Sequence, residues 1–233
     1  DGGHTGTEKR STRRSTQNIY IQHSEVSQIP QCSPTQPGHL ITPALGFSFF
    51  MLLTACVLSS LISRDRLPLS TRGRHVIDRN GARVRLSCVN WYGAHMELFA
   101  VAGLNHVPMD TISQRIAALG FNCIRLPLSI ELWANDPLVT TIALRNGSSL
   151  LGSRGMGLLD ATVSSLTRAG LLIILNDHTS AAGWCCDLNS EEGIWSNPAF
   201  DASRWLEFLG ALAGRYRSEP MVIGFDLRNE IHE

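Results

Sequence analysis

The feature that most constrains the fold is an alternation of short apolar runs with stretches of helical period. The apolar runs lie at 84–91, 121–127, 171–177 and 221–227, and the helical patterns lie at 110–120, 158–170 and 201–216. Runs this short suit strands better than helices, and each of the first three is followed by a helical stretch. We therefore expect parallel strands joined by right-handed helical crossovers. The third run, LLIILND, is apolar on both faces, as expected in a buried parallel sheet.

The helical stretches carry signals for where they begin and which face they bury. Asp110 is expected to cap the first helix, and Gly120 to end it. Apolar residues at helical spacing predict one buried stripe on each helix. These residues are Ile112, Ile116, Leu119, Leu159, Val163, Leu166, Trp205, Phe208, Leu209 and Leu212.

Two α/β folds fit this element order, an open doubly wound sheet and a closed (β/α)8 TIM barrel. A dinucleotide-binding sheet would need a GxGxxG loop after its first strand. The chain instead reads YGAHMELFAVAG after Trp91. We expect the barrel, with only its first four βα units present.

Polar or aromatic side chains stand near the end of each apolar run. The first run ends at Asn90 and Trp91, the second carries Arg125, the third ends at Asp177 and His178, and the fourth is followed by Asn229 and Glu230. In a barrel the carboxyl ends of the strands converge on one mouth, where active sites of this fold lie. One polar residue at a strand end would only mean that the strand meets solvent, but four in order predict a site.

The segments FNCIRLP, LNDHTS and GFDLRNE together resemble the second, third and fourth strands of glycoside hydrolase family 5, the cellulase family. The resemblance covers residues 73–233. It implies a (β/α)8 barrel and a retaining endo-β-glycanase that needs no cofactor and no metal. The implied catalytic residues are Glu230, Asn229, Arg125 and His178, and the implied substrate-binding residues are Trp91, Asn90 and Trp184.

The chemistry of glycoside hydrolysis agrees with these assignments. A retaining enzyme holds a proton donor and a second carboxylate about 5 Å apart on opposite sides of the sugar. Glu230 is the expected donor, and its pKa would have to be raised by burial and by the partner carboxylate. Asn229 can donate to the sugar 2-hydroxyl, and the resemblance places Arg125 beside the nucleophile and His178 in a sugar subsite. Simpler alternatives are a buried Arg125–Asp226 pair, a core Trp91 and a structural His178.

The sequence departs from the family pattern in two ways. Ile231 follows Asn229 and Glu230 where most members have a proline. The nucleophile of the family is a glutamate on the seventh strand, and no residue here corresponds to it. Four glutamates considered for this role stand in the wrong places, namely Glu97, Glu131, Glu191 and Glu192. We therefore expect the N-terminal half of an enzyme, inactive by itself.

Composition and residue types help to distinguish between the competing functions. The expected partner is a polysaccharide, either a β-glucan or a β-mannan. The alternative is a membrane-anchored carbohydrate-binding protein without catalysis. An aldolase-type lyase would need a lysine at a strand end, and the only lysine is Lys9. The net charge of zero argues against a nucleic-acid partner, and the oligomeric state is unknown from the sequence.

The region before the barrel divides by composition. Residues 1–43 are rich in Thr, Ser, Gln, Gly and Pro and are expected to be a disordered tail. Residues 44–62 carry no charge and suit a transmembrane helix or signal-anchor. Residues 63–73 would be a linker, followed by the half barrel at 74–233. We expect a membrane-anchored or secreted protein with an extracellular catalytic domain, although Arg64 and Arg66 favour the cytosol by the positive-inside rule.

The six cysteines show no spacing suited to zinc. Cys185 and Cys186 are adjacent and could pair with Cys88 or Cys123 in an oxidising compartment. Cys88 and Cys123 are better explained as small buried hydrophobic residues on strands. Asn146 begins a glycosylation sequon, which weakly favours a secreted domain.

Overall fold

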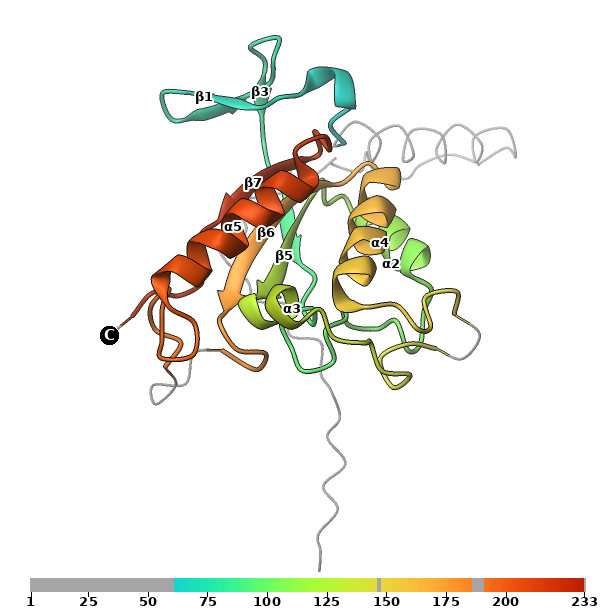
Figure 1. Cartoon of the computed structure of the whole chain (residues 1–233). Helices are drawn as coiled ribbons and strands as arrows, with labels where there is room; N and C mark the ends of the chain where they lie inside the picture. Colours follow the sequence, from blue (N-terminus) through green and yellow to red (C-terminus); the bar gives the residue numbers. More distant parts are fainter. Residues whose placement is uncertain (1–60, 146–147, 186–190, 233) are drawn as a thin grey trace, which may run out of the picture. The chain divides into compact units, whose positions relative to one another are not determined.

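The computed structural model describes residues 61–145, 148–185 and 191–232, which form a parallel sheet flanked by helices (Figure 1). The strands are β4 (Cys88–Asn90), β5 (Cys123–Ser129), β6 (Leu172–Thr179) and β7 (Val222–Asp226). They are neighbours in chain order, and every pair is parallel. This confirms the order and direction expected from the sequence. The predicted tail at 1–43 lies outside the described residues.

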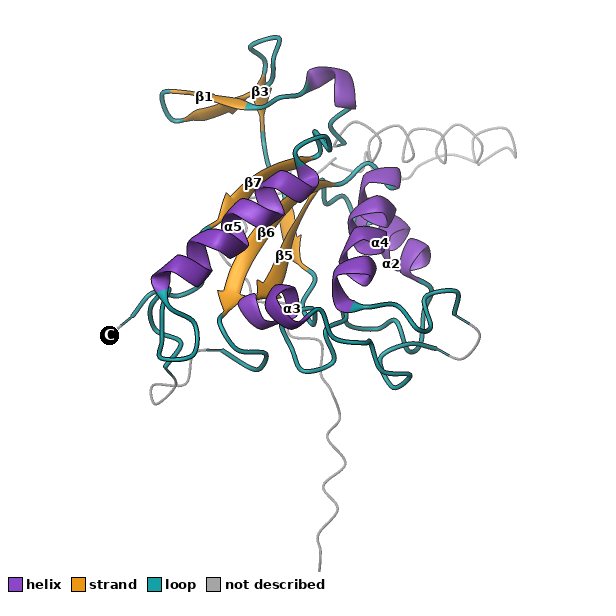
Figure 2. Ribbon diagram, in the orientation of Figure 1, coloured by secondary structure: helices purple, strands orange, loops and turns teal. Residues whose placement is uncertain are grey.

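Four helices connect and cover these strands (Figure 2). They are α2 (Met109–Ala118), α3 (Ile130–Asn135), α4 (Gly155–Arg168) and α5 (Ala202–Tyr216). The stripe on α4 is confirmed, because Leu159, Val163 and Leu166 are all buried. Helix α3 was not predicted, since its six residues are too few to show a helical period.

The first helix differs from expectation in its N-cap and in the exposure of Leu119, whereas its end at Gly120 agrees. Its N-cap is Pro108, so Asp110 does not cap it. The Asp110 carboxylate instead accepts hydrogen bonds from Ser165 and Arg168 at 2.6 Å each, which ties α2 to α4. Leu119 is 76% exposed, so its place on the buried face was also wrong. Gly120 follows with a φ of 90°, the left-handed geometry that ends many helices.

The helices pack on one face of the sheet. Ile124, Leu126 and Leu128 of β5 belong to the same buried cluster as Leu166 of α4 and Phe208 of α5. Phe225 of β7 also packs against this cluster. A doubly wound sheet would carry helices on both faces, so this arrangement favours the barrel. Leu126 and Phe225 therefore face the helices and do not fill the inside of the barrel.

The other face of the sheet meets a small antiparallel sheet at the N-terminal ends of the strands. This sheet contains β1 (Ser70–Arg72), β2 (His75–Ile77) and β3 (Arg83–Val84), preceded by the 3-10 helix η1 (Arg64–Arg66). Apolar residues from this region form a second cluster with β5 and β6. The buried members of that cluster are Ile62, Leu67, Val84, Cys123, Leu172 and Met221. We call this region the floor of the domain.

The floor corrects two predicted boundaries. Residues 63–73 are not a linker, because they contain η1 and β1. The predicted strand at 84–91 is divided, since Val84 pairs with Val76 in the floor while β4 begins only at Cys88. Sequence periodicity could not show this break, because apolar residues continue through both strands.

Most of the predicted membrane segment, 44–60, lies outside the described residues. In the ranges given above, no helix is both long and apolar enough to cross a bilayer. The last two residues of that segment, Leu61 and Ile62, are not helical. Ile62 is buried in the floor cluster, and Leu61 packs against the helix-side cluster. The domain therefore begins before the boundary that the sequence suggested.

Cys88 and Cys123 form a disulfide between paired positions of β4 and β5. The expectation that both were unbonded small hydrophobic residues was therefore wrong. Cys123 is fully buried, as expected, whereas Cys88 is exposed. Cys185 is also disulfide-bonded, and its partner is neither of these two.

Candidate active site

The structure brings Arg125 of β5 into direct contact with Asp226 and Asn229 at the carboxyl end of β7. The Arg125 Nε donates to Asp226 Oδ2 at 2.7 Å, and its Nη2 donates to Asn229 Oδ1 at 2.8 Å. The Arg125–Asp226 pair drawn from the sequence as an alternative is therefore present, but its side chains are 23% and 34% exposed and not buried. Because Arg125 occupies Oδ1, the amide nitrogen of Asn229 points elsewhere and can donate. This nitrogen donates to the Cys185 sulfur at 3.3 Å.

His178 lies at the end of β6 with a defined proton arrangement. Asn176 donates through Nδ2 to the Asp177 carbonyl at 3.0 Å, which leaves its Oδ1 as an acceptor 2.7 Å from His178 Nδ1. The assigned tautomer therefore carries its proton on Nδ1, and Nε2 is the acceptor. Burial, with the neighbouring His95, lowers the pKa of His178 to about 3. A neutral His178 can accept a hydrogen bond from a hydroxyl group.

His95 was not singled out from the sequence, yet it packs against His178. The two ring centroids are 4.4 Å apart, and His95 is 2% exposed. Burial lowers the pKa of His95 to about 4, so this ring is also neutral near neutral pH. Its position depends on the loop after β4, which local periodicity does not describe.

Asn229 and Glu230 follow β7 in a tight turn. The Asn229 backbone N–H donates to the Asp177 carbonyl at 2.9 Å, and Asn229 is 6% exposed. Glu230 is exposed, and its φ is 40°. Residues other than glycine seldom adopt this left-handed geometry, and such positions cluster at functional sites. The structure therefore presents the Glu230 carboxylate to solvent at the mouth.

The three predicted substrate-binding residues fall in different environments. Asn90 is exposed and pairs in register with Arg125, so both side chains lie on the same side of the sheet. Trp184 is 72% exposed in the loop after β6 and could stack on a sugar. Trp91 is only 6% exposed, and its indole N–H donates to the Ala102 carbonyl at 2.9 Å. Trp91 is a core residue, and its ring offers no face to a sugar.

A buried ionic network lies behind the turn and was missed from the sequence. The Arg228 side chain is 1% exposed and lies 3.3 Å from Asp177 Oδ2 and 2.6 Å from Glu192 Oε2. Burial raises the pKa of Asp177 to about 7, against the opposing effect of Arg228. The only signal in the sequence was the place of Arg228 directly before Asn229, since a buried arginine looks like a surface residue in a hydropathy pattern.

No group of three or more His, Cys, Asp or Glu side chains is arranged to hold a metal ion, as far as the described ranges show. The acidic residues nearest the mouth already have partners. Glu131 accepts from the Ala182 N–H at 2.7 Å, and Glu192 accepts from the Ser180 and Ala181 N–H groups at 2.6 and 3.0 Å. These glutamates hold the loop after β6 and are not positioned as a nucleophile.

Comparison with known proteins identifies the same family over most of the chain. The family model described as Cellulase (glycosyl hydrolase family 5) matches residues 77–233. A glycosyl hydrolase 5 family protein of Chamaecyparis obtusa is 36% identical over 198 residues, which cover 77% of this chain and 35% of that protein. An endoglucanase of Paenibacillus polymyxa is 28% identical over 162 residues, which cover 70% of this chain and 39% of that protein. The chain therefore spans little more than a third of these relatives.

Solved structures support the fold. A hyperthermophilic endocellulase of Pyrococcus horikoshii matches with a TM-score of 0.64 at 22% identity, covering 74% of this chain and 45% of that one. The catalytic domain of the major endoglucanase of Xanthomonas campestris pv. campestris matches with a TM-score of 0.62 at 24% identity, covering 71% and 46%. The parallel sheet and its helices are thus one part of a larger barrel architecture.

Proposed function

Because this chain belongs to glycosyl hydrolase family 5, we propose that it supplies the first four βα units of a retaining endo-β-glycanase that cleaves internal bonds of a polysaccharide. In this proposal Glu230 is the general acid that protonates the leaving oxygen, and the same residue then acts as general base. The nucleophilic carboxylate would come from a strand beyond those described here.

One observation carries the proposal most directly, the contact of Arg125 with Asn229 beside Glu230. Arg125 holds the Asn229 oxygen at 2.8 Å, which directs the amide nitrogen away from the arginine as a donor. A donor beside the acid can bind the sugar 2-hydroxyl, a contact that strengthens in the transition state. The same guanidinium would favour the ionised form of a carboxylate placed near it.

His178 adds a second contact to the proposed subsite. Its Nε2 is an acceptor, because Asn176 fixes the proton on Nδ1. A sugar hydroxyl can donate to that nitrogen, and a neutral imidazole does not compete with Glu230 as an acid. The exposed ring of Trp184 would supply an apolar surface for a pyranose face.

The proposed substrate is a β-glucan. Relatives described above are named as endoglucanases, and one solved structure of the Pyrococcus horikoshii endocellulase contains cellotetraose. The β-mannan also expected from the sequence gains no support from these names. We further propose that the domain works outside the cytosol. The Cys88–Cys123 disulfide supports this, because such bonds persist mainly in oxidising compartments.

The decisive experiment replaces Glu230 with glutamine in the full-length catalytic domain. On a soluble β-glucan, Glu230→Gln should lower kcat/KM by about 1,000-fold, because a poor leaving group needs protonation. On an aryl cellobioside whose leaving group needs no proton, kcat/KM should change by less than about 10-fold. Azide should restore turnover of the aryl substrate, since this nucleophile needs no general base.

Glu207→Gln is the matched control, because Glu207 is an exposed glutamate of α5 that pairs with Arg204. It should leave both substrates unaffected. Equal loss on the two substrates by Glu230→Gln, or no loss on either, would remove Glu230 from the acid role. Binding of glucan without any hydrolysis by the unmodified domain would instead indicate a carbohydrate-binding protein.

A further inference from the structure

We propose that Arg228 is the positioning residue for the acid/base turn, and that it acts by joining that turn to the loop after β6 through Glu192. The inference rests on the proposed role of Glu230 and concerns a residue that would not touch the sugar. Arg228 directly precedes Asn229 and Glu230, and its side chain is 1% exposed.

The contacts of Arg228 reach two separate segments. Its Nη2 donates to the Glu192 side chain at 2.6 Å and to the Glu192 carbonyl at 3.0 Å. Its Nη1 lies 3.3 and 3.4 Å from the two oxygens of Asp177 at the end of β6. A guanidinium can serve several acceptors in one plane, which a lysine ammonium cannot reproduce.

Glu192 extends the connection to the loop that carries Trp184. Its two carboxylate oxygens accept from the Ser180 and Ala181 backbone N–H groups at 2.6 and 3.0 Å. The next residue, Gly193, accepts through its carbonyl from the His232 N–H at 2.8 Å. The loop after β6 and the turn after β7 are therefore bound to each other on both sides of Glu230.

In this proposal the network holds the backbone of Glu230 in its unusual conformation. A φ of 40° is unfavourable for a residue with a side chain, so the turn keeps this geometry only if its surroundings hold it. Glu230 itself is exposed and has little packing of its own to fix the carboxylate. Without Arg228 the turn would relax, and a displacement of about 1 Å in a catalytic group can cost about 100-fold in rate.

The test compares Arg228→Met, Arg228→Lys and Glu192→Gln in the full-length catalytic domain, on the two substrates used for Glu230. Arg228→Met should lower kcat/KM for the soluble β-glucan by about 100-fold and for the activated aryl cellobioside by less than about 5-fold. Arg228→Lys and Glu192→Gln should each cost about 10-fold on the glucan only. The KM for the glucan should stay within about twofold, because sugar contacts remain.

Arg66→Met is the control, because Arg66 also pairs with a buried aspartate, Asp78, at 2.7 Å, but in the floor and with a side chain that is 30% exposed. It should affect both substrates equally and slightly. If Arg228→Met fails to unfold cooperatively, Arg228→Lys and Glu192→Gln decide the question by the same ratio of losses. Equal losses on both substrates in those variants would show a general structural role and overturn the proposal.

The acid role of Glu230 and the positioning role of Arg228 can fail separately. If Glu230→Gln shows no preference for the poor leaving group, the acid assignment has failed. If Glu230→Gln shows that preference and none of the Arg228 and Glu192 variants does, the acid assignment stands and Arg228 is not its positioning residue.

Discussion

Replacing Asp177 with asparagine should remove a pH-dependent loss of stability from the full-length catalytic domain. The Asp177 side chain is 0% exposed, and burial raises its pKa from 3.8 to about 7. The groups facing it are Arg228, which opposes the shift, Glu192, which adds to it, and Trp205, which opposes it. Asparagine resembles the protonated acid in size and carries no charge at any pH.

The direction of the pKa shift of Asp177 determines how the stability of the domain changes with pH. The unfolded chain releases the Asp177 proton near pH 4, whereas the folded domain retains it until about pH 7. The stabilising contribution is therefore complete below pH 4 and is lost as the pH rises through 7. At about 1.4 kcal/mol per pH unit, the interval from 3.8 to about 7 corresponds to a loss of about 4 kcal/mol.

Urea unfolding between pH 4 and pH 8 measures this difference. Asp177→Asn and the unmodified domain should have similar free energies of unfolding at pH 4, and the variant should be more stable by up to about 4 kcal/mol at pH 8. Asp201→Asn, at the exposed N-cap of α5, is the control, and its effect should not vary between pH 5 and pH 8 because the pKa of Asp201 is lowered. A variant that is less stable than the unmodified domain at pH 8, with the gap closing toward pH 4, would show that the Arg228 ion pair outweighs burial.

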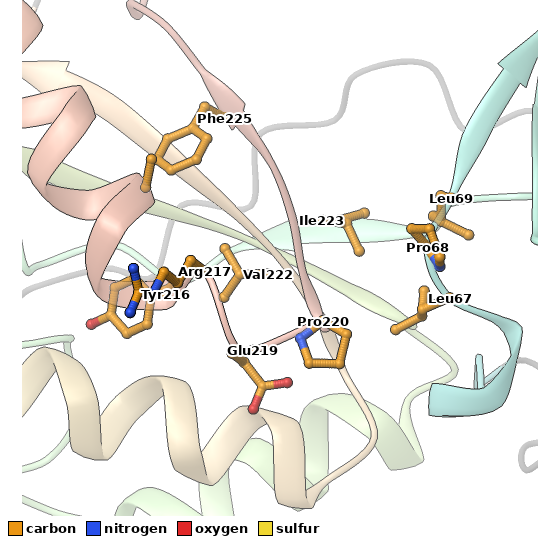
Figure 3. Close-up of a pocket in the computed structure, with 11 residues that line it drawn as sticks. Leu67, Pro68, Leu69, Tyr216, Arg217, Glu219, Pro220, Val222, Ile223 and Phe225 are labelled. Atoms are coloured by element: carbon orange, nitrogen blue, oxygen red, sulfur yellow. The ribbon is translucent and has the colours of Figure 1, made fainter.

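Two further predictions concern the sheet and its cysteines. Residues 61–232 expressed alone should aggregate and show no cooperative thermal transition, because β7 pairs only with β6 in the described part of the chain. A pocket of ≈ 360 Å³ lined by Ile223 and Phe225 also stays open to solvent beside β7 (Figure 3). A monomer with a sharp transition by circular dichroism would refute this prediction. Cys88 and Cys123 should be recovered as one linked peptide when the native protein is alkylated before reduction, and free thiols at both positions would refute the extracytosolic assignment.

The sequence predicted the elements whose pattern is local and repeated. The buried stripe of Leu159, Val163 and Leu166 depends only on helical spacing, and the parallel strands depend on the order of the elements. The floor was missed because β1, β2 and β3 contain only two or three residues each. Strands this short show no alternation that could be recognised against the charged residues around them.

The candidate site was predicted where residues stand at strand ends and was missed where it depends on side-chain contacts. Arg125 and His178 could be placed because the strands carry them to one edge of the sheet. Whether Trp91 is buried or exposed could not be predicted, since a residue just after a strand can turn toward solvent or toward the core. Arg228 was missed because its burial depends on Asp177 and Glu192, which lie 51 and 36 residues away along the chain.

The floor also sets how far the N-terminal region can be trimmed. Ile62 and Leu67 precede the barrel pattern, yet they are buried against Cys123 and Leu172 at the base of β5 and β6. A protease that cut at residue 74 would remove Ile62 and Leu67 from this cluster and uncover the base of β5 and β6. Any proteolytic processing that leaves this domain folded would therefore have to spare Leu61 and Ile62.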